Sequence, residues 1–473
     1  LSPLDSVLWV SHMQVTHSIF KAYDIRGIVG KTLTPEFVEI IGRAIGSEAI
    51  DRKQTEICVG FDGRLSGPEL SNALIKGILK TGIHVINLGM VTTPMVYFST
   101  FFLKTQSGVM VTGSHNPPDY NGLKMVLGSD TLSTEAIQKL YARIEKESFY
   151  EGQGIEKKYD IANDYIEAIK NHIHLKRPMK IVIDCGNGVA GAYARKIYES
   201  IGCSVEELFC DVDGTFPNHH PDPSEPHNLN DVIAHLKQSD AELGFAFDGD
   251  ADRLGVVTKD GQIIYPDRQL LLFAEDVLSR NPNATIIFDV KSTRNLFQWI
   301  KDKGGKPLMW KTGHSLIKAK MKEENAALAG EMSGHTFFKE RWYGFDDGIY
   351  AGVRLLEILS RFDNPSEVLN NLPNSISTPE LQIKMNEGEP HALIKKLQTE
   401  AQFDNALEII KVDGLRVEYE DGFGLMRASN TTPVIVLRFE AENKIALERI
   451  QNSFRAVLSL ASPNSVLPFY AFD

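Results

Sequence analysis

Three stretches of this chain open in the same way, with an apolar run that predicts a buried strand and an aspartate close to its end. The aspartates are Asp62, Asp184 and Asp289. Each is followed by a helical segment, such as LSNALIKGILKTG at 70–82, and then by another apolar run. Strands that alternate with helices predict mostly parallel sheets covered by helices on both faces. The stretches lie too far apart for a solenoid, whose repeats reach roughly 50 residues, so they predict repeated α/β domains.

The last part of the chain departs from this alternation. After the third stretch the sequence changes to strands with one long helix, ENKIALERIQNSFRAVLSL, which predicts a smaller α+β domain. We expect residues 1–14 to be a leader outside the folded domains. The domains are then expected at 15–157, 158–261, 262–373 and 374–473.

Charge and composition narrow the classes of partner. The 473 residues carry 62 acidic and 50 basic side chains, a formal net charge of −12, so we expect no nucleic-acid partner. No apolar run approaches the roughly 18 residues of a membrane span, so we expect no membrane partner. The four cysteines lack C-x-x-C spacing and the N-terminus lacks a secretory signal. These features predict a cytoplasmic protein with reduced, buried thiols.

An acidic loop, FDGDADR, joins two apolar runs and places Asp248, Asp250 and Asp252 at alternate positions. Three carboxylates within five residues repel one another unless a cation lies between them, and oxygen ligands suit a hard ion such as Mg²⁺. An EF-hand is excluded, because its sixth and twelfth positions hold Arg253 and Lys259 instead of Gly and Glu. A solvated acidic turn is the alternative, but the apolar flanks and the short loop favour a metal site.

The stretch GVMVTGSHNPPDYNGLKMV, residues 108–126, ends an apolar run close to Ser114, and two prolines then prevent a helix. A serine hydroxyl is a poor nucleophile unless a base, a metal or an attached group activates it. His115 and Lys124 are nearby in the sequence. Gly, Ser, Asn and Pro are also the residues of ordinary turns, so the stretch alone fits either interpretation. The acidic loop favours the nucleophile.

The segment RASNTTP places several hydrogen-bond donors in one turn before a strand. A guanidinium with hydroxyl and backbone donors is suited to a phosphate dianion. These donors come from Arg427, Ser429, Asn430, Thr431 and Thr432. A polar hairpin loop is the alternative.

In GEMSGHTFF, the polar residues Glu331, Ser333 and His335 alternate. In an extended segment they would share one face and offer an acceptor, a hydroxyl and an imidazole to one ligand. Sugar hydroxyls need such a mixture. A solvent-facing strand would show the same alternation, so the segment alone decides nothing.

One segment points to a different class of protein. CGNGVAG places Gly186, Gly188 and Gly191 in G-x-G-x-x-G spacing after an apolar run and before a helix, as in a dinucleotide-binding site. The first and third repeats share the topology without this spacing. No separate group of residues for hydride transfer is evident, which argues against a nicotinamide enzyme.

With the four polar loops in this order, the chain resembles the α-D-phosphohexomutase superfamily, most closely its bacterial phosphomannomutase/phosphoglucomutase branch. The resemblance runs from FKAYDIRG at 20–27 to NSVLPF at 464–469, and its specific motifs are TGSHNPPDYNG, FDGDADR, GEMSGHTFFKERWYGFDDG and RASNTTP. It implies four domains around a central cleft, three of them related mixed α/β units and the fourth a smaller α+β unit. In that fold the glycine-rich turn is scaffold.

The resemblance also implies roles for single residues, matched motif by motif. Ser114 would carry a phosphoryl group, and together with the three aspartates of the acidic loop it would hold Mg²⁺. The catalytic group would be Ser114, Lys124, Arg26 and His115, with proton handling and charge neutralisation expected of Lys124 and Arg26. Substrate would be bound by Tyr23, Arg253, Lys291, His314, Glu331, Ser333, His335, Arg427, Ser429, Asn430 and Thr431. Within this set Glu331, Ser333 and His335 would hold the sugar, and the last four would clamp the phosphate that is not reacting.

The activity implied is reversible conversion of mannose 1-phosphate and glucose 1-phosphate into the 6-phosphates. It would proceed through the phosphoserine and a 1,6-bisphosphate intermediate, with glucose 1,6-bisphosphate as activator and hexose phosphates as the partners of a monomeric enzyme. A phosphoglucosamine mutase is the near alternative, although GEMSGH favours the mannose/glucose branch. A metal-dependent phosphatase would release phosphate and need no second clamp. A sugar-phosphate binding protein would use the same cleft without turnover.

Overall fold

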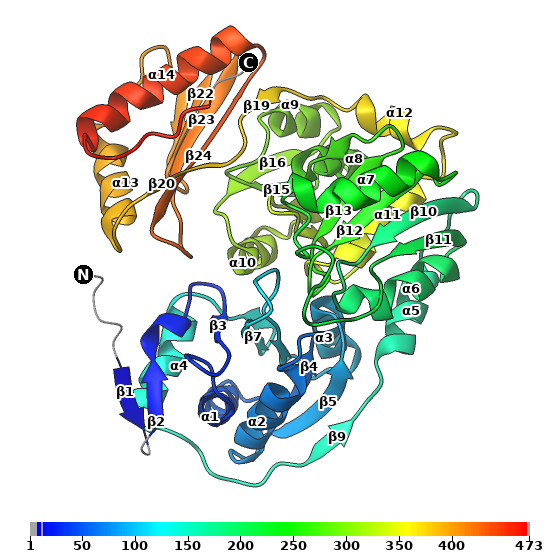
Figure 1. Cartoon of the computed structure of the whole chain (residues 1–473), viewed down its shortest axis with the longest axis vertical. Helices are drawn as coiled ribbons and strands as arrows, with labels where there is room; N and C mark the ends of the chain where they lie inside the picture. The colour runs from blue at the N-terminus through cyan, green and yellow to red at the C-terminus, as the bar shows by residue number, and fades with distance from the viewer. Residues whose placement is uncertain (1–6, 11–12, 471–473) are drawn as a thin grey trace.

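The computed structural model describes residues 7–10 and 13–470. After a two-stranded hairpin, four larger sheets follow one another along the described residues, and we call the units built on these four domains 1 to 4. Figure 1 shows domain 1 at the bottom, domains 2 and 3 on the right and domain 4 at the upper left. Among the described residues, no helix has both the length and the apolar character that a membrane crossing requires.

Domain 1 contains a seven-stranded mixed sheet in the order β3-β7-β6-β4-β5-β9, with β8 paired to β7. Its strands are β3 (Ile25–Ile28), β4 (Glu56–Phe61), β5 (His84–Met90), β6 (Gly108–Val111), β7 (Tyr120–Leu127), β8 (Asp130–Thr131) and β9 (Glu156–Lys158). Its helices are η1 (His17–Ile19), α1 (Pro35–Asp51), α2 (Gly67–Leu79), α3 (Thr93–Phe102) and α4 (Glu135–Glu145).

Domain 2 contains a five-stranded sheet in the order β11-β10-β12-β13-β14. Its strands are β10 (Met179–Asp184), β11 (Cys203–Leu208), β12 (Leu243–Phe247), β13 (Leu254–Thr258) and β14 (Ile263–Ile264). Its helices are α5 (Ala162–Lys170), η2 (Val189–Ala192), α6 (Ala194–Ser200), η3 (Pro226–Leu229) and α7 (Asn230–Gln238).

Domain 3 contains a four-stranded sheet in the order β16-β15-β17-β18. Its strands are β15 (Thr285–Asp289), β16 (Lys306–Trp310), β17 (Leu328–Gly330) and β18 (Thr336–Phe338). Its helices are α8 (Pro266–Arg280), α9 (Asn295–Asp302), α10 (His314–Glu324), α11 (Gly348–Leu359) and α12 (Pro365–Asn370).

The first three domains repeat one plan. In each, a central strand (β4, β10 or β15) pairs in parallel with the next strand and with the one after that. This third strand then turns back into an antiparallel partner, giving the pairs β6–β7, β12–β13 and β17–β18. The expected repeat of mixed α/β units is therefore confirmed. The turns of these three pairs carry the Ser114 stretch, the acidic loop and the Glu331 segment, so each polar loop occupies the same place in its domain.

The repeated aspartates hold these turns in place. Asp62, directly after β4, accepts a hydrogen bond from the Thr112 hydroxyl at 2.6 Å, two residues before Ser114. Asp289, the last residue of β15, accepts one from the backbone N–H of Met332 at 3.0 Å, beside Glu331. A carboxylate at the end of the central strand thus fixes the neighbouring turn in domains 1 and 3.

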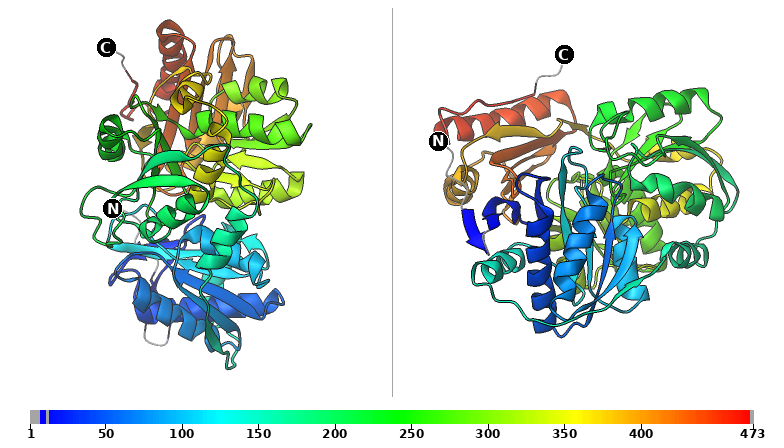
Figure 2. Two further views of the ribbon diagram at one scale, coloured as in Figure 1. Left: turned by 90° about the vertical axis from the view of Figure 1, so that its right-hand side faces the viewer. Right: turned by 60° about the horizontal axis from the view of Figure 1, so that its bottom comes forward.

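Domain 4 is the expected α+β unit. Its sheet runs β19-β24-β23-β22-β21, with β20 also paired to β24, and Figure 2 shows the long helix α14 lying across this sheet. Its strands are β19 (Ile376–Ser377), β20 (Leu381–Lys384), β21 (Glu408–Ile410), β22 (Leu415–Tyr419), β23 (Gly422–Ala428) and β24 (Val434–Ala441). Its helices are α13 (Glu389–Glu400) and α14 (Lys444–Ala461).

Domain 4 rests on domain 3 through two buried arginines. Arg416 on β22 donates to the backbone carbonyls of Val290 and Ser292 at 2.9 and 2.6 Å, and Arg438 on β24 donates to that of Lys291. The Phe423 ring lies between them, with the Arg416 guanidinium 3.7 Å from its centroid. The loop that follows β15 is therefore hydrogen-bonded to the sheet of domain 4.

The glycine-rich turn after β10 packs against the chain itself. A Cβ on Gly191 would collide with the backbone of Cys210, and one on Gly188 would lie 3.0 Å from the Cα of Gly249 in the acidic loop. The glycines thus allow close backbone packing, and the segment leads into the short 3₁₀ helix η2 before α6 begins. This arrangement agrees with scaffold and leaves the nucleotide-binding alternative without structural support.

Part of the segment expected to be a leader is paired. Strand β1 (Val7–Val10) pairs antiparallel with β2 (Met13–Thr16), forming a hairpin ahead of domain 1. Residues 1–6 and 11–12 of the expected leader lie outside the described residues.

Candidate active site

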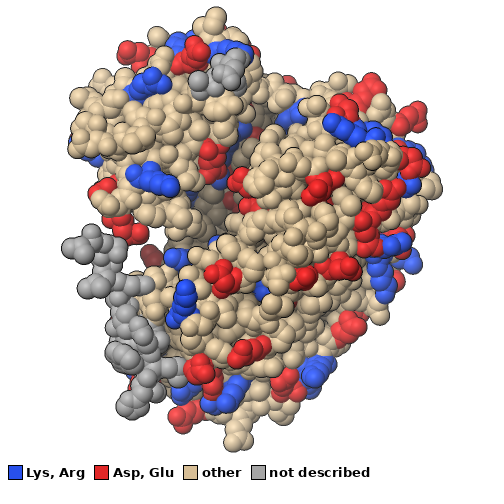
Figure 3. Space-filling model, viewed as in Figure 1, with Lys and Arg blue, Asp and Glu red and all other residues tan. Residues whose placement is uncertain are grey.

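The polar loops meet at one cleft of about 940 Å³ between the domains. Figure 3 shows the molecule hollowed between domain 4 and the remainder. All four domains contribute predicted residues to the wall, namely Tyr23, Arg26, Ser114, His115, Lys124, Arg253, Lys291, His314, Glu331, Ser333, His335 and Thr431. The aspartates of the acidic loop are buried next to Lys124.

Ser114 follows β6 in a strained backbone conformation, with φ at +55°, a region that side chains other than Gly seldom adopt. Its N–H donates to the Thr112 hydroxyl at 2.8 Å, and its Oγ lies 3.2 Å from Nδ1 of His115. A Cβ on Gly249 would collide with the carbonyl oxygen of Ser114, so the acidic loop packs directly against this turn. The structure therefore brings the predicted nucleophile to the predicted metal loop.

A buried arginine that sequence reasoning missed supports the Ser114 loop. The Arg64 guanidinium donates to four carbonyl oxygens between residues 114 and 120, at 2.6 to 3.3 Å. Its side chain is fully buried, and its Nε lies 3.6 Å from Asp62. Burial raises the pKa of Asp62 to about 6, with Arg64 acting in the opposite direction. The signal was available, since Arg64 follows the first repeated aspartate by two positions.

The acidic loop joins β12 to β13 and concentrates negative charge. Ligand oxygens of its three aspartates lie within 4.8 Å of one another. Lys124 bridges Asp250 and Asp252, with Nζ at 2.7 and 2.8 Å, and Arg253 pairs with Asp248 at 2.9 Å. Among the described residues, one buried oxygen each of Asp250 and Asp252 has no hydrogen-bond partner. Such oxygens in an all-carboxylate set suit a hard divalent cation, so the residues fit the metal.

Charge pairing dominates this loop. Burial lowers the pKa of Lys124, but Asp250 and Asp252 outweigh burial and raise the pKa well above its usual value. Burial raises the pKa of Asp248 far above its usual range, and the neighbouring aspartates raise it further. Lys124 is therefore charged at neutral pH, and it reaches the acidic loop from β7 across the interface of domains 1 and 2.

The Glu331 segment forms a turn, which corrects the sequence expectation. Strand β17 ends at Gly330 and β18 begins at Thr336, and the N–H of Glu331 donates to the carbonyl of His335 at 2.9 Å. The argument from alternation in an extended segment was therefore wrong, although Glu331, Ser333 and His335 all line the cleft. The Ser333 hydroxyl lies 2.8 Å from Nδ1 of His335.

Glu331 is almost fully buried, and only one of its two carboxylate oxygens accepts a hydrogen bond. Its Oε2 accepts from the N–H of Gly313 at 2.8 Å, while Oε1 has no hydrogen-bond partner among the described residues and lies 3.6 Å from Nδ1 of His335. Burial raises the pKa of Glu331 to about 7, and nearby His335 acts in the opposite direction. A carboxylate with a free oxygen in a polar cleft is suited to accepting hydrogen bonds from hydroxyl groups.

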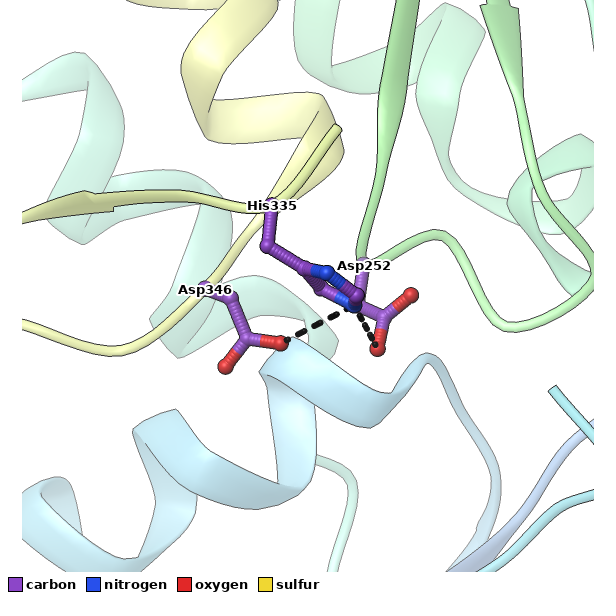
Figure 4. A group of neighbouring side chains, drawn as sticks. All are labelled: Asp252, His335 and Asp346. Carbon is purple, nitrogen blue, oxygen red and sulfur yellow. Dashed lines mark ion pairs between the residues drawn. The ribbon is translucent and has the colours of Figure 1, made fainter. Parts of the chain in front are cut away.

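His335 connects this turn to the acidic loop. Figure 4 shows its ring between Asp252 and Asp346, with Nε2 at 3.5 and 3.8 Å from their oxygens. Lys318 on α10 pairs with the other oxygen of Asp346 at 3.0 Å. Asp252, His335 and Asp346 form a second group with the spacing of metal ligands, but this group shares Asp252 with the three aspartates of the acidic loop. Asp346 and Lys318 were not predicted, although Asp346 lies within the motif GEMSGHTFFKERWYGFDDG.

Other predicted residues join the loops to one another. Arg253 donates to the carbonyl of Ser333 at 3.1 Å, which ties the acidic loop to the Glu331 turn. Arg26 donates to Asn116 at 3.1 Å, beside the Ser114 loop. The rings of His314 and His335 lie 5.8 Å apart. Burial, and after it Lys318, hold the pKa of His314 well below its usual value, so this ring is neutral.

The Arg427 loop belongs to the hairpin of β23 and β24, and of its predicted residues Thr431 lines the cleft while Arg427, Ser429 and Asn430 are not among the lining residues. The Ser429 hydroxyl accepts from the N–H groups of Thr431 and Thr432 at 3.2 and 3.3 Å, which closes the turn. Asn430 donates to the Tyr23 hydroxyl at 2.8 Å and so joins domain 4 to domain 1. Arg427 is buried, with Nε 3.1 Å from Asp413. Lys291 lies 3.5 Å from Glu380, which is between β19 and β20.

Comparison with known proteins matches this four-domain arrangement. The protein-family models of phosphoglucomutase/phosphomannomutase alpha/beta/alpha domains I, II and III match residues 17–151, 163–261 and 265–376. The family model of the C-terminal domain matches residues 380–457. The chain belongs to the phosphoglucomutase/phosphomannomutase family. The resemblance inferred from the motifs is thereby confirmed, together with the expected fold class.

Individual relatives within this family cover nearly the whole chain. A phosphoglucomutase of Neisseria meningitidis serogroup A is 64% identical over 457 residues, 96% of this chain and 99% of the relative. A phosphomannomutase/phosphoglucomutase of Pseudomonas aeruginosa is 56% identical over 453 residues, 96% of this chain and 98% of the relative. The crystal structure of a phosphoglucomutase/phosphomannomutase family protein from Burkholderia thailandensis is 58% identical with a TM-score of 0.93, covering 96% and 100% of the two chains.

Proposed function

We propose that this phosphohexomutase converts mannose 1-phosphate and glucose 1-phosphate into the corresponding 6-phosphates, by way of phosphorylated Ser114 and a 1,6-bisphosphate. One observation carries the proposal: Ser114 packs on the acidic loop and shares a cleft with the Glu331 carboxylate of domain 3 and with Thr431 of the domain 4 loop that begins at Arg427. The names of the relatives at 64% and 56% identity, phosphoglucomutase and phosphomannomutase/phosphoglucomutase, support the same substrates.

Asp248, Asp250 and Asp252, together with the phosphoryl group on Ser114, would hold Mg²⁺. A bound Mg²⁺ supplies positive charge to the transferring phosphate, which lowers the cost of charge developing in the transition state. Lys124 and Arg26 add further positive charge at the same end of the cleft.

The chain's own groups handle the proton at Ser114. Burial, and after it the charge of Arg253, hold the pKa of His115 well below its usual value, so its ring is neutral at pH 7. With Nδ1 at 3.2 Å from Ser114 Oγ, it can take the proton that the sugar hydroxyl loses and pass it to Ser114 Oγ when Ser114 leaves, and in the second transfer it can take the serine proton and pass it to the departing sugar oxygen. This assigns proton transfer at Ser114 to His115 and charge neutralisation to Lys124 and Arg26.

The reaction consists of two phosphoryl transfers. In the first, the free 6-hydroxyl of a sugar 1-phosphate loses its proton and forms a bond to the phosphorus, as the bond to Ser114 Oγ breaks. The 1,6-bisphosphate then turns end for end within the cleft. In the second, Ser114 Oγ forms a bond to the phosphorus at C1 and the bond to the sugar oxygen breaks, which releases the 6-phosphate and restores the phosphoserine.

Substrate binding is divided between domains 3 and 4. We assign the sugar hydroxyls to Glu331, Ser333 and His335, whose polar atoms face the cleft. Tyr23, Arg253, Lys291 and His314 surround that position. The phosphate that is not reacting is assigned to Arg427, Ser429, Asn430 and Thr431, because a guanidinium beside backbone and hydroxyl donors favours a dianion. The cleft is complete within one chain, so we propose that the enzyme acts as a monomer, with glucose 1,6-bisphosphate as its activator.

Intact-mass measurement tests the central step. Incubating the protein with glucose 1,6-bisphosphate and Mg²⁺ should add the mass of one phosphoryl group to the parent and none to Ser114→Ala. In coupled assays the parent should isomerise mannose and glucose 1-phosphates faster than glucosamine 1-phosphate. Full mutase activity in Ser114→Ala would exclude the phosphoserine. Release of inorganic phosphate instead of isomerisation would identify a phosphatase, and a preference for glucosamine 1-phosphate would identify the near alternative.

A further inference from the structure

One residue just before α10, Thr312, is held by three domains. The N–H of Thr312 donates to Asp413 of domain 4 at 3.0 Å. Its carbonyl oxygen accepts from the Tyr23 hydroxyl of domain 1 at 2.9 Å, and its own hydroxyl donates to Asp289 of domain 3 at 3.0 Å. Every polar group of Thr312 is therefore used, and its position depends on how the three domains are packed.

Asp413 lies in the turn between β21 and β22 and also contacts the Arg427 loop. Its carboxylate is 3.1 Å from Nε of Arg427, and its side chain is 14% exposed. Burial lowers the pKa of Arg427, but Asp413 outweighs burial and raises it. The next residue, Gly414, has φ at +81°, and a Cβ there would lie 2.7 Å from Cβ of Arg427. This turn is therefore seated closely on the strand that carries Arg427.

The residue after Thr312, Gly313, contacts the Glu331 carboxylate, which we assigned to the sugar. The N–H of Gly313 donates to Oε2 of Glu331 at 2.8 Å. Gly313 has φ at +137°, and a Cβ there would lie 2.6 Å from the Tyr23 ring, so only a glycine allows this packing. Tyr23 is in turn the acceptor for Asn430 at 2.8 Å. The 312–313 segment thus connects Glu331 to the Arg427 loop by two routes, one through Asp413 and one through Tyr23.

We propose that Asp413 is a positioning residue that holds the Arg427 guanidinium and the Glu331 carboxylate at a fixed distance from each other. It acts through Arg427 on one side and through the 312–313 segment on the other. The proposal deepens the proposed function and rests on it, because it concerns how the phosphate clamp and the sugar carboxylate are held relative to each other. A bisphosphate that binds in two orientations needs this spacing to stay constant.

Charge alone predicts the opposite effect. A carboxylate beside the clamp repels a bound phosphate, so a residue without a positioning role would improve substrate binding once its charge was removed. Asp413→Asn keeps an oxygen that can accept from Thr312 but loses the charge that faces Arg427. Asp413→Ala loses both contacts. If Asp413 positions the clamp, Asp413→Asn should weaken catalysis and Asp413→Ala should weaken it more.

The test is a double-mutant cycle. We expect Asp413→Ala to lower kcat/KM for glucose 1-phosphate by at least about tenfold, with Asp413→Asn in between. In the double variant Asp413→Ala/Glu331→Gln, the fold-loss of kcat/KM should be smaller, by at least about threefold, than the product of the fold-losses in the two single variants. Residues in one network behave in this way. Asp421→Ala is the matched control, because it also removes a domain 4 aspartate that pairs with an arginine, Arg449, away from the cleft. Its kcat/KM should stay within about twofold of the parent.

Three results would overturn the proposal: Asp413→Asn binding substrate more tightly than the parent, Asp413→Ala staying within about threefold of the parent, or losses that multiply fully with Glu331→Gln. Thermal unfolding midpoints show whether each variant is folded, and Asp413→Asn decides the case if Asp413→Ala is not. The same cycle is measured for glucose 1-phosphate binding by calorimetry. A parent without turnover would then contradict the proposed function, while the binding cycle still decides the role of Asp413.

Discussion

Glu331 shows how one side chain limits what the cleft can distinguish. Its free oxygen Oε1 is available to sugar hydroxyls, while Oε2 is already used by Gly313. Mannose and glucose differ only in the configuration at C2, and the intermediate has to bind in two reversed orientations. A pocket that fitted C2 closely in one orientation would have to fit it again in the other. The site is therefore expected to hold hydroxyls that both sugars share.

From this we predict similar kcat/KM values for mannose 1-phosphate and glucose 1-phosphate, within about tenfold of each other. Glu331→Ala should lower both by about a hundredfold or more, since it removes an acceptor from a buried site. Steady-state assays of both substrates, in the parent and the variant, check the prediction. A preference above about a thousandfold for one sugar would mean that C2 is read directly, because only a hydrogen bond to a distinguishing hydroxyl discriminates so strongly.

Residue types and their spacing singled out the Ser114 stretch and the acidic loop in advance, and the structure brings the two into contact. Ser114 beside two prolines and the alternate aspartates at 248, 250 and 252 are unusual enough to predict a reactive serine and a metal. Asp413 and Lys318 were missed, because a single charged residue outside a motif has no distinguishing pattern, and Arg64 was missed although it follows a repeated aspartate by two positions. Their importance comes from contacts with segments far away in the sequence, such as the 289 residues between Tyr23 and Thr312.

Helix α11 shows a consequence of burying an acid at a helix end. Asp347 caps this helix, accepting from the N–H of Tyr350 at 3.0 Å, and also accepts from the Tyr165 hydroxyl. Burial raises the pKa of Asp347 from 3.8 to about 7, although both hydrogen bonds act to lower it. An acid with a raised pKa in the folded protein stabilises it fully below the unfolded pKa. This contribution is lost as the pH rises towards the folded value.

We therefore predict that Asp347→Asn becomes more stable relative to the parent as the pH rises from about 5 to about 7, with a constant difference above that. Asparagine caps a helix as well as aspartate but never carries the buried charge. Thermal unfolding midpoints at several pH values measure the difference.

Asn443→Asp, at the exposed N-cap of α14, is the control. An exposed aspartate is ionised throughout this pH window, so its difference from the parent should not change. If the difference in unfolding midpoint between Asp347→Asn and the parent also stayed constant over this pH range, the raised pKa of Asp347 would be contradicted.

At the scale of elements, strands and repeats could be predicted better than loops. The apolar runs before Asp62, Asp184 and Asp289 became β4, β10 and β15, because a continuous apolar run bounded by turn residues has few other uses in a sheet protein. The 331–335 segment was misjudged, because alternating polar residues suit a strand and a tight turn alike. Its turn is set by the Asp289 hydrogen bond to Met332, which local sequence does not reveal.

The molecule as a whole should respond to a ligand that reaches two domains. Domain 4 has its own hydrophobic core between its sheet and α14, and a larger core spans domains 1 to 3 and also includes Phe423 and Leu425 of β23. A bisphosphate that contacts both the Ser114 end and the Arg427 loop adds a connection between these parts. Binding to the folded state alone then stabilises the protein, by about 2.7 kcal/mol at a ligand concentration of 100 times Kd.

We predict that glucose 1,6-bisphosphate raises the unfolding midpoint of Ser114→Ala, which binds the ligand without exchanging phosphate. Adding Arg427→Ala should remove most of this rise, since a buried pair with a dianion is worth about 2–5 kcal/mol. Adding Arg449→Ala, at an exposed ion pair of domain 4, should leave the rise unchanged. Differential scanning calorimetry measures all three, and an equal rise with and without Arg427 would place the phosphate elsewhere.

The order of the four loops along the chain has a consequence for synthesis on the ribosome. The Ser114 turn emerges first, the acidic loop and the Glu331 turn follow, and the Arg427 hairpin comes after all three. Domains generally fold as units from the N-terminus during synthesis, so a nascent chain that has three folded domains still has no clamp. A nonsense codon between α12 and β23 would therefore yield a largely folded protein that carries Ser114 and the acidic loop but lacks the proposed phosphate clamp. In the proposed mechanism, turnover begins only once the Arg427 hairpin has been made.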